Sequence, residues 1–404
     1  MIVKIKPSRL CGSLSAPPSK SMAHRLLISA GLADGTSVVC GVAPSEDVLA
    51  TIDCLAALGV RCEYDGKDVR VSGVSPEKMT VRATLPCREC GSTLRFFIPI
   101  CLLTGERATL SGSERLLGRP MSVYETLCRE RGFEFSNDGK NITVCGKLES
   151  GEYTLRGDVS SQFVSGLLFA LPTLDGDSRI TLTGKVESRP YIDMTIGALR
   201  KFGTVVRWEN ENTIYVRGCQ EYAPADVTVE GDWSNAAFFC AADLIGGDVE
   251  VTELDENSAQ GDKVCVGYFK KLAVGAPTLP LGDCPDLGPI MFAMAAEKHG
   301  ATFTGTSRLR AKESDRVASM TEELVKFGAE FEISDDTVTV KNTALRAPTE
   351  TLSSHGDHRV AMALSVLMTK YGGTLAGAEA VKKSMPDFYE RLASLGANII
   401  YEDK

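Results

Sequence analysis

The sequence has 404 residues, 43% of them apolar and 24% charged, which is typical of a globular protein and excludes an intrinsically disordered chain. This length exceeds what one compact core usually holds, so we expect two domains. The net charge of −9 argues against a nucleic-acid partner, because a phosphate backbone selects for a basic surface. No apolar run reaches the roughly 18 residues of a membrane span, and the first residues lack the pattern of a signal peptide. We therefore expect a cytoplasmic protein with no membrane partner.

The first predicted element is a strand over Met1–Lys6, whose alternation is typical of an edge strand. After it a pattern recurs six times: a small polar cluster, a strongly apolar helix, a strand, an amphipathic helix that ends at a glycine, and a second strand. The six helix-ending signals are Leu58-Gly59, Arg131-Gly132, Phe202-Gly203, Val274-Gly275, Phe327-Gly328 and Leu395-Gly396. Each repeat is long enough to form one mixed α/β unit.

The repeat that begins at Gly157 shows the pattern most clearly. Residues 163–171 are apolar on nearly every face, which predicts a helix that is buried all round. Residues 180–184 form a short predicted strand, residues 194–202 have the period of an amphipathic helix, and residues 204–208 return as a strand. The repeats that begin at Gly231, Gly282 and Gly356 follow the same order.

Each repeat opens with a polar cluster of its own, which repeats kept for packing alone would not need. The clusters are Ser19-Lys20-Ser21, Glu89-Cys90-Gly91-Ser92-Thr93, Asp158 to Gln162, Asp232 to Asn235, Asp283 to Asp286, and Asp357-His358-Arg359. Helix N-termini carry free N–H groups and partial positive charge. If the buried helices are parallel, the clusters meet at one end and form an anion site.

The first cluster places Lys20 in the first turn of a helix, where its charge opposes the helix dipole. A cation held against that field suggests an anionic partner. Arg25 lies too far along the helix to cap it, so it would pair with an anion or with a neighbouring carboxylate. The cluster lacks the glycines of a nucleotide-binding phosphate loop, so a nucleotide site is poorly supported.

Thirteen cysteines are spread through apolar segments, where free Cys behaves as a small hydrophobe. Cys87-Arg88-Glu89-Cys90 is a lone C-x-x-C pair without a second pair at zinc-site spacing. The four histidines supply no pair at i and i+4. We therefore expect neither a metal site nor a redox role.

Nine segments in the same order along the chain resemble the enolpyruvyl transferases, and among them those that act on shikimate 3-phosphate. They are Pro18-Ser19-Lys20-Ser21 with Arg25, Gly91-Ser92-Thr93-Leu94-Arg95, Gly118-Arg119-Pro120, Asp158-Val159-Ser160-Ser161-Gln162-Phe163, Ser188-Arg189-Pro190-Tyr191, Cys284-Pro285-Asp286, Lys312-Glu313-Ser314-Asp315-Arg316, Asp357-His358-Arg359 and Lys383-Ser384-Met385-Pro386-Asp387. The resemblance implies an α/β fold built from α+β repeats. Two similar domains would each have three units with mixed sheets around buried parallel helices, as in an inside-out α/β barrel.

The resemblance also implies two sets of substrate-binding residues. Shikimate 3-phosphate would be held by Lys20, Ser21, Arg25, Ser160, Ser161, Ser188, Tyr191, Asp286 and Lys312. Phosphoenolpyruvate would be held by Lys20, Gly91, Arg119, Gln162, Arg316, Arg359 and Lys383. These residue types suit phosphate and carboxylate groups, since Arg forks bind both in a bidentate manner. From the sequence alone, Gly91 is also consistent with a helix start, Gln162 with a cap, Ser188 with a turn and Tyr191 with the core.

The implied reaction adds the 5-hydroxyl of shikimate 3-phosphate to C2 of phosphoenolpyruvate, protonates C3, and then expels phosphate from a tetrahedral adduct. Two acid/base groups are required, and the catalytic candidates are Lys20, Asp286, Glu313 and Lys312, with Asp286 on the hydroxyl side and Glu313 near C3. Glu313 is alternatively a salt-bridge partner of Arg316, three residues further along a helix. Phosphoenolpyruvate is already an activated enol ether, so no metal and no organic cofactor is expected.

Two residues depart from the family pattern. Glu89 is found where the family often has Asn, which puts a ligand contact there in doubt, and Arg308 is found where many members have Asn. The domains implied are residues 15–230, binding mainly shikimate 3-phosphate, and residues 1–14 plus 231–404, contributing acid/base and phosphoenolpyruvate-binding residues. Because the candidates come from both halves, we expect the domains to close on the substrates.

Two alternatives remain open from the sequence. One is enolpyruvyl transfer to UDP-N-acetylglucosamine, which would favour a Cys in a loop near Arg119 and an Asn beside Lys20; this chain has Leu116-Leu117-Gly118 and Ser21 there. The other is a non-catalytic anion-binding repeat protein, which would not need Asp286 and Glu313 among its cations. We expect a monomer whose partners are the two small substrates.

Overall fold

A computed structural model describes residues 1–402 of the chain. The chain divides into two compact units: a central unit, Pro18–Glu230, and a terminal unit formed by Met1–Pro17 together with Gly231–Lys404. The chain first passes from the terminal unit to the central unit between residues 17 and 18. The sequence predicted this boundary between residues 14 and 15. Each unit is described below by itself.

The central unit contains three repeats of helices and strands. Its elements are α1 (Lys20–Leu32), β3 (Gly35–Cys40), α2 (Glu46–Ala57), β4 (Arg61–Tyr64), β5 (Val69–Gly73), β6 (Leu85–Pro86), α3 (Gly91–Thr104), β7 (Ala108–Ser111), α4 (Glu114–Leu117), α5 (Ser122–Arg131), β8 (Glu134–Asn137), β9 (Asn141–Cys145), β10 (Glu152–Arg156), α6 (Ser161–Ala170), β11 (Ser178–Thr183), α7 (Arg189–Lys201), β12 (Val206–Trp208), β13 (Thr213–Val216) and β14 (Val227–Thr228).

The terminal unit repeats this order with strands from both ends of the sequence. Its elements are β1 (Ile2–Lys6), β2 (Cys11–Ser15), α8 (Trp233–Cys240), β15 (Asp248–Thr252), α9 (Cys265–Val274), β16 (Thr278–Pro280), α10 (Gly288–Glu297), β17 (Ala301–Thr304), α11 (Arg316–Lys326), β18 (Phe331–Ile333), β19 (Thr337–Val340), β20 (Leu352–Ser353), α12 (His358–Tyr371), β21 (Gly373–Ala376), α13 (Phe388–Ser394) and β22 (Asn398–Glu402).

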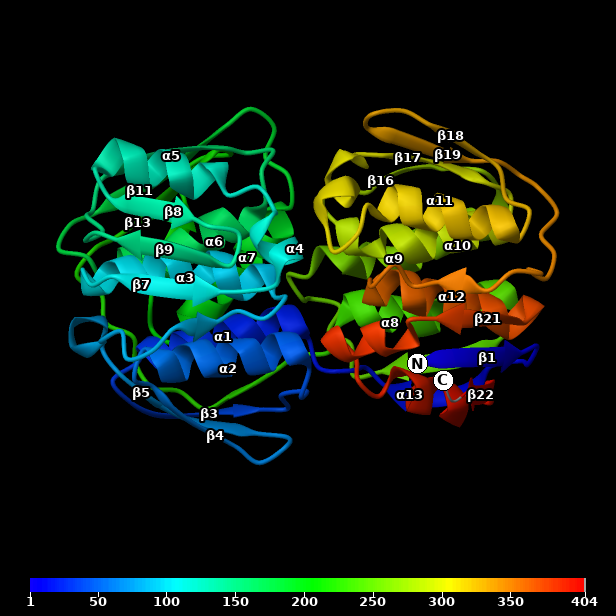
Figure 1. Cartoon of the computed structure of the whole chain (residues 1–404), viewed down its shortest axis with the longest axis horizontal. Helices are drawn as coiled ribbons and strands as arrows, with labels where there is room; N and C mark the ends of the chain where they lie inside the picture. Colours follow the sequence, from blue (N-terminus) through cyan, green and yellow to red (C-terminus); the bar gives the residue numbers. More distant parts are fainter. Residues whose placement is uncertain (403–404) are drawn as a thin grey trace. The chain divides into compact units, whose positions relative to one another are not determined.

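Five of the six sheets in residues 1–402 share one pairing scheme, and this confirms the repeat and the predicted α/β class. Their strand orders are β14-β3-β5-β4, β6-β7-β9-β8, β10-β11-β13-β12, β16-β17-β19-β18 and β20-β21-β1-β22. In each sheet the first pair is parallel and the other two pairs are antiparallel. The sixth sheet contains only the parallel pair of β15 and β2. Within the terminal unit, helices α10 to α12 lie between the sheet of β16–β19 and the sheet that contains β1 (Figure 1).

The prediction that Met1–Lys6 forms an edge strand is wrong in one respect. Strand β1 is an interior strand, paired antiparallel with β21 on one side and with β22 on the other. Its alternation has a different cause: Val3 and Ile5 face the core, whereas Lys4 and Lys6 face solvent. Alternation of apolar and polar residues indicates that one face of a strand is buried. It does not indicate whether the strand lies at the edge or in the interior of its sheet.

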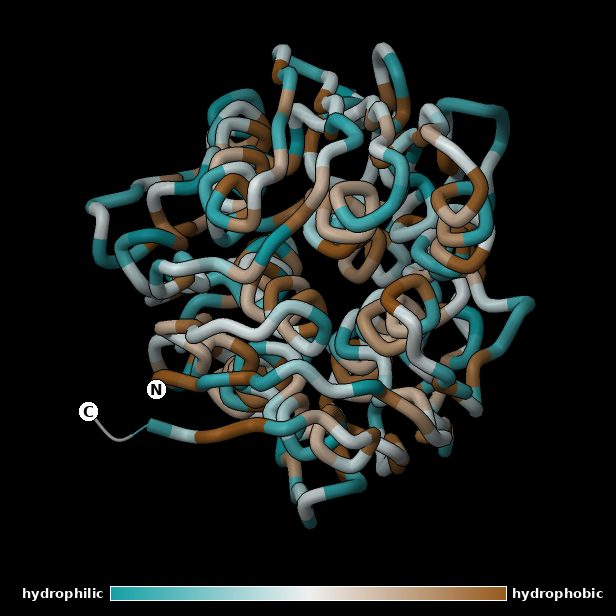
Figure 2. Tube along the Cα trace, turned by 90° about the vertical axis from the view of Figure 1, so that its right-hand side faces the viewer, coloured by the Kyte–Doolittle hydropathy of each residue, from teal (hydrophilic) through white to brown (hydrophobic). Residues whose placement is uncertain are grey.

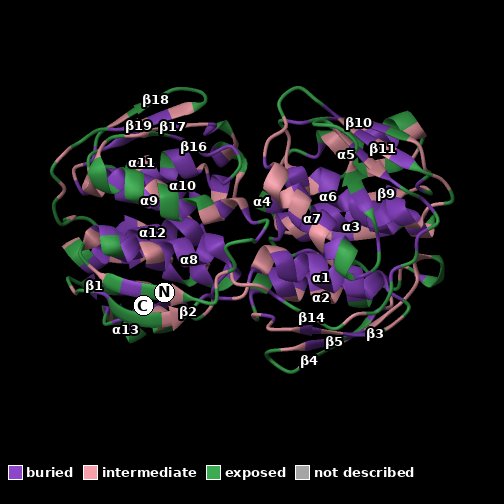
Figure 3. Ribbon diagram, turned by 180° about the vertical axis from the view of Figure 1, so that it is seen from behind, coloured by how far each residue is buried: buried purple, intermediate pink, exposed green. Residues whose placement is uncertain are grey.

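The two helix types predicted from the apolar patterns are both present. In α6 every residue except Gln162 is buried, and in α10 every residue except Glu297 is buried. By contrast, α5 buries only Tyr124, Leu127 and Cys128 and exposes its charged side. Figure 3 shows α3, α6 and α10 as buried along most of their length. In Figure 2 the helices contain both brown and teal stretches, and teal prevails in many of the outermost loops.

All six predicted helix-ending signals lie at helix C-termini. At five of them the glycine adopts a positive φ between 69° and 101°, the left-handed conformation that glycine tolerates best. Gly275 is the exception, since its φ of 176° is extended backbone. No helix among residues 1–402 combines the length and the apolar character of a membrane span.

A proline inside α3 determines how the core of the central unit is bonded. Pro99 has no N–H, so the carbonyl of Arg95, four residues earlier, lacks its usual helical donor. The Tyr124 hydroxyl lies 2.8 Å from that carbonyl and 3.1 Å from the carbonyl of Phe163 in α6. Gly166 permits this approach, because a Cβ there would lie 2.4 Å from the Tyr124 hydroxyl. One tyrosine therefore fixes α3 against α6, the two helices that begin with proposed ligand residues.

Candidate active site

The six polar clusters lie at the N-terminal ends of the six buried helices, as predicted. Lys20 is the first residue of α1, Cys90 caps α3, Ser160 caps α6, Asp232 caps α8 and Asp357 caps α12. Before α10 the chain forms a single 3-10 turn over Pro285–Leu287, which contains Asp286, the last residue of the fifth cluster.

In the central unit, Lys20 forms an ion pair with a residue that the sequence analysis did not select. Its Nζ lies 2.9 Å from Oδ2 of Asp47, in the first turn of α2. The side chains of Lys20 and Asp47 are only 14% and 6% exposed, so water screens their attraction weakly. Asp47 follows Ser45, which caps α2. That cap was the only sequence signal for it, and caps are common at helix starts.

Arg25 is a buried guanidinium whose partners are neutral. It donates to Thr195 Oγ1 at 2.8 Å, to the Ser21 carbonyl at 2.7 Å and to the Tyr191 carbonyl at 3.0 Å, and it lies over the Phe96 ring. No carboxylate of residues 1–402 lies within ion-pair distance of it. Burial lowers the pKa of Arg25 to about 10. Of the two sequence-based alternatives, an anion or a neighbouring carboxylate, the fold does not supply the carboxylate.

The N-terminus of α3 lies close to two arginines and a glutamine. A Cβ on Gly91 would lie 2.8 Å from Nη1 of Arg119 and 3.3 Å from Nη1 of Arg95. Arg95 donates to Gln162 Oε1 at 2.7 Å, and Gln162 Nε2 donates to Ser92 Oγ at 2.8 Å. Gln162 therefore links α6 to α3 instead of capping its own helix; Ser160 supplies the cap. Arg95 belonged to a recognised motif but had been given no role.

The remaining predicted residues of the central unit lie around α6 and α7. Ser161 is buried in the first turn of α6. Ser188 is buried and has a φ of 56°, an unusual left-handed conformation for a serine, directly before α7. Tyr191 is partly buried and packs against the core, and its carbonyl accepts from Thr195 and Arg25. Tyr191 therefore packs on the core and also contacts Arg25, a predicted site residue.

In the terminal unit, Arg316 is the centre of an ion-pair network. It is 1% exposed and bonds three carboxylates: Nη1 with Asp286 at 2.8 Å, Nη2 with Glu313 at 2.9 Å, and Nε with Asp357 at 2.9 Å. Burial opposes the charge of Arg316, but these carboxylates outweigh it and raise the pKa. The salt bridge considered as an alternative role for Glu313 is therefore present, and it leaves a second oxygen 3.7 Å from Lys383 Nζ.

Asp286 is held by three cations. Lys312 Nζ lies 3.4 Å from Oδ1, and Arg359 Nη2 lies 3.2 Å from Oδ2, in addition to Arg316. Burial favours the neutral acid, yet Arg359, Lys312 and Arg316 hold the pKa of Asp286 well below its usual range. Burial lowers the pKa of Lys312 and Asp286 only partly opposes this shift.

Arg359 connects the helix starts of the terminal unit. It is 2% exposed, and its Nη2 donates to Ser234 Oγ at 2.8 Å, in the first turn of α8. Together with its contact to Asp286, this brings the starts of α8, α10 and α12 to one place. Ser234 was part of a predicted cluster, but its partner is 125 residues away, so sequence reasoning did not pair them.

The two departures from the family pattern differ in their surroundings. Glu89 is exposed and follows Arg88, which has a φ of 53°. Arg308 is partly buried, and its charge is among the causes that lower the pKa of Lys312. Arg308 therefore lies near the proposed shikimate 3-phosphate residue, whereas Glu89 faces solvent.

A second set of buried polar residues lies behind Lys20. His24 Nδ1 lies 2.7 Å from Thr51 Oγ1, which lies 2.7 Å from Thr93 Oγ1, and His24 Nε2 lies 3.8 Å from Cys90 Sγ. Burial lowers the pKa of His24 to about 3, so its ring is neutral at neutral pH. Of these residues, Cys90 and Thr93 belong to the predicted polar cluster before α3, and Cys90 also belongs to the lone C-x-x-C pair for which no metal or redox role is expected. His24 and Thr51 were not predicted from the sequence.

Comparisons with known proteins agree on one family. The sequence model of EPSP synthase (3-phosphoshikimate 1-carboxyvinyltransferase) matches residues 4–275 and 277–392. The 3-phosphoshikimate 1-carboxyvinyltransferases of Clostridium kluyveri and Clostridium novyi are 38% and 36% identical to this chain, over 98% of this chain and 98% of each relative. A solved EPSP synthase from Acinetobacter baumannii has the same fold, with a TM-score of 0.82 at 23% identity over 99% of this chain and 100% of the solved one.

Proposed function

Because this chain belongs to the EPSP synthase family, we propose that polar and charged residues of the central and terminal units act together in one enolpyruvyl transfer. The chain is a transferase of the shikimate pathway: it moves the enolpyruvyl group of phosphoenolpyruvate to shikimate 3-phosphate, in aromatic amino acid biosynthesis. The residue roles below are the proposal, and the bonds of each cluster support them.

The central cluster is proposed to bind shikimate 3-phosphate. Its residues are Lys20, Ser21, Arg25, Ser160, Ser161, Ser188 and Tyr191, joined by Asp286 and Lys312 of the terminal unit. Ser160 and Ser161 lie at the start of α6, where backbone N–H groups and the helix dipole favour an anion. Arg25 has only neutral partners, so a phosphate would supply the negative charge that this buried guanidinium lacks.

Phosphoenolpyruvate is proposed to bind Lys20, Gly91, Arg119 and Gln162 of the central unit and Arg316, Arg359 and Lys383 of the terminal unit. Gly91 has no side chain to fill the space beside Arg119, so the backbone N–H groups at the start of α3 remain accessible. Gln162 is oriented by Arg95 and Ser92. Three arginines and two lysines match the phosphate and the carboxylate of this substrate.

In the proposed mechanism Asp286 accepts the proton of the attacking 5-hydroxyl and Glu313 exchanges the proton at C3 of phosphoenolpyruvate. Lys20 and Lys312 stabilise the charge that develops in the tetrahedral adduct. Asp286 is a weak base while three cations hold it. When phosphoenolpyruvate recruits Arg316 and Arg359, their hold on Asp286 weakens, its pKa rises, and it becomes a better base.

One observation carries these roles: Asp286 and Glu313 bond two nitrogens of the same guanidinium, Arg316, at 2.8 and 2.9 Å. One anionic substrate that engages Arg316 therefore affects both acid/base candidates at once. A structural ion pair alone would not require two carboxylates from separate segments on one arginine.

The test is phosphate release from phosphoenolpyruvate, measured with shikimate 3-phosphate and with UDP-N-acetylglucosamine as acceptors. We expect release with the first acceptor only. An Asp286→Asn variant should keep its affinity for phosphoenolpyruvate within a few fold and lose turnover. Equal turnover in the variant and the parent would remove Asp286 from the proposed mechanism. A cytoplasmic, monomeric protein is part of the same proposal and is tested by fractionation and by light scattering.

A further inference from the structure

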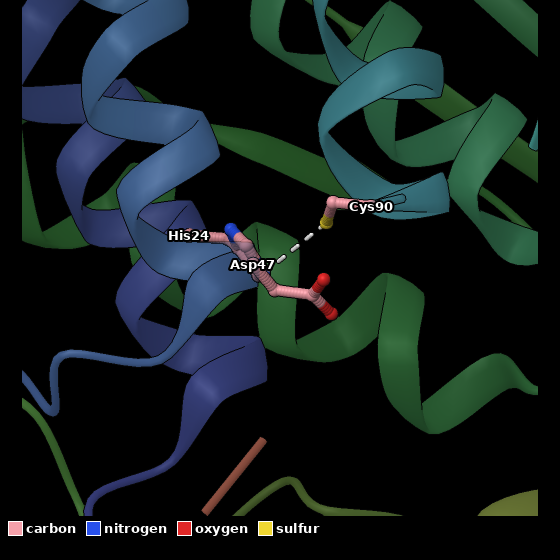
Figure 4. Close-up of side chains that lie close together, drawn as sticks. All are labelled: His24, Asp47 and Cys90. Carbon is pink, nitrogen blue, oxygen red and sulfur yellow. Dashed lines mark hydrogen bonds between the residues drawn. The ribbon is translucent and has the colours of Figure 1, made fainter. Parts of the chain in front are cut away.

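Three metal-ligating side chains converge directly behind Lys20. His24 comes from α1, Asp47 from the first turn of α2 and Cys90 from the cap of α3, and all three are buried. One ligand atom of each lies within 4.8 Å of the other two. Figure 4 shows the Cys90 thiol directed toward the His24 ring, with Asp47 beside them.

We propose that His24, Asp47 and Cys90 form a binding site for a divalent cation that favours nitrogen and sulfur ligands, such as Zn²⁺, and that the bound ion takes Asp47 away from Lys20. Local Cys-x-x-Cys and His-x-x-x-His spacings do not predict this site. This site joins residues 23 and 43 positions apart, which no local motif describes.

The distances suit a small tetrahedral ion. Zn–N and Zn–S bonds of about 2.0 and 2.3 Å place neighbouring ligand atoms roughly 3.5 Å apart. His24 Nε2 and Cys90 Sγ lie 3.8 Å apart, so shifts of a few tenths of an ångström would complete that edge. A carboxylate as third ligand leaves a fourth position for water, the arrangement of an open site. Hard ions such as Mg²⁺ prefer oxygen ligands and would be poorly served.

The surroundings support both the histidine and the cysteine as ligands. His24 Nδ1 lies 2.7 Å from Thr51 Oγ1, and Thr51 lies 2.7 Å from Thr93, so the second ring nitrogen is fixed toward Cys90. Ligating histidines are commonly oriented in this way through their other nitrogen. Cys90 Sγ accepts the N–H of Thr93 at the start of α3. Burial raises the pKa of this thiol to about 12, so the bound cation itself would have to displace the thiol proton.

The site is coupled to Lys20 through Asp47. Lys20 Nζ lies 2.9 Å from Asp47 Oδ2, and a doubly charged ion on that carboxylate would compete with the ammonium and repel it. This step rests on the proposed role of Lys20 in binding both substrates, whereas the metal site itself does not. Occupancy of the metal site should therefore inhibit the enzyme.

A second cluster in residues 1–402, Glu322, Glu323 and His355, offers no sulfur ligand, and Lys326 already binds Glu323 through both oxygens.

Absorption spectroscopy with Co²⁺ tests the site without reference to activity. The metal-free full-length chain should give a thiolate-to-cobalt charge-transfer band on titration. Cys90→Ser should abolish the band while keeping a capping oxygen for α3. His24→Gln should weaken Co²⁺ binding by at least about tenfold. A control chain with Cys11→Ser, Cys219→Ser and His355→Gln, which removes two exposed thiols and the other cluster's histidine, should keep the band.

Turnover in the same samples separates this inference from the proposed function. Zn²⁺ should inhibit the parent and the control chain, and a chelator should restore both. Cys90→Ser should resist Zn²⁺ relative to its own metal-free turnover, and its melting temperature should show that it is folded. No band in the parent, or a band that persists in Cys90→Ser, overturns the site. A band without inhibition overturns the coupling to Lys20. Failure of the metal-free parent to turn over overturns the proposed function and leaves the spectroscopic result intact.

Discussion

The central and terminal units each contain a buried arginine in the candidate site, but the partners of the two guanidinium groups differ. Arg25 and Arg316 are equally buried, at 2% and 1% exposure. Arg25 bonds a hydroxyl and two carbonyls and has a lowered pKa, whereas Arg316 bonds three carboxylates and has a raised one. A buried charge with neutral partners is favoured only when an anion arrives. A fully paired charge is already stable, and in the proposed mechanism Arg316 holds and releases carboxylates.

The largest effect is expected from Lys20→Met, which removes the cation assigned to both substrates. kcat/KM should fall by at least about 10²- to 10³-fold, since charge stabilisation at a reacting centre is usually worth that much. Phosphate release and a melting curve measure turnover and folding. Lys67→Met, at an exposed position, is the matched control and should be normal. Near-normal turnover of Lys20→Met would remove Lys20 from the proposed mechanism.

Glu313→Gln tests whether the terminal cluster does chemistry or only packing. The amide keeps the shape and can still accept from Arg316, but it cannot exchange a proton. We expect kcat to fall by about 10²- to 10⁴-fold, with a smaller change in KM for phosphoenolpyruvate. Glu322→Gln, at an exposed position in the helix α11 that follows Glu313, is the control. A loss of stability with unchanged kcat would make Glu313 a structural residue.

Gly91→Ala tests the proposed role of the start of α3 in binding phosphoenolpyruvate. The new Cβ would lie 2.8 Å from Arg119 Nη1, and the flexible guanidinium would shift while the fold remains. KM for phosphoenolpyruvate should rise by about ten- to a hundredfold, and KM for shikimate 3-phosphate should change less. Gly197→Ala in α7 has nothing within 4 Å of its Cβ and should leave both constants unchanged.

The pH dependence of shikimate 3-phosphate binding tests Lys312. Its pKa lies below 10.5 because burial penalises its charge more than Asp286 restores it. Lys312 therefore loses its proton at a lower pH than an ordinary lysine, and KM should rise as the pH rises through that value. Lys312→Arg keeps its charge, so this alkaline limb should move to higher pH. If the alkaline rise in KM stays at the same pH in Lys312→Arg, another group causes it. Lys326→Arg is the control and should leave the pH profile unchanged.

The smallest effect concerns the scaffold that orients Arg95 and Gln162. Tyr124→Phe leaves the Arg95 carbonyl without its donor beside Pro99. Urea unfolding should show a loss of about 1–3 kcal/mol. Tyr401→Phe, at an exposed position, should be neutral. Equal stability of the two variants would mean that water or another group serves the carbonyl.

Local patterns predicted the repeat because each element buries its own stripe of residues. The apolar run at 163–171 and the glycine after Phe202 needed no knowledge of distant residues. The partners of the site residues were not predictable in this way: Asp47 lies 27 residues from Lys20, and Ser234 lies 125 residues from Arg359. Family motifs selected Asp286 and Arg316, but only the fold shows that both meet Glu313 and Asp357 in one network.

Strand β1 imposes an order of assembly on the growing chain. It pairs with residues 373–376 and 398–402, so its sheet is incomplete until nearly the whole chain has left the ribosome. The central unit takes all its strands from residues 18–230 and has no such requirement. Domains generally fold as units during synthesis, with the earlier ones first. The central unit can therefore fold before β21 and β22, the partner strands of β1, have been synthesised. Until then the apolar face of β1, with Val3 and Ile5, has no sheet to complete its burial.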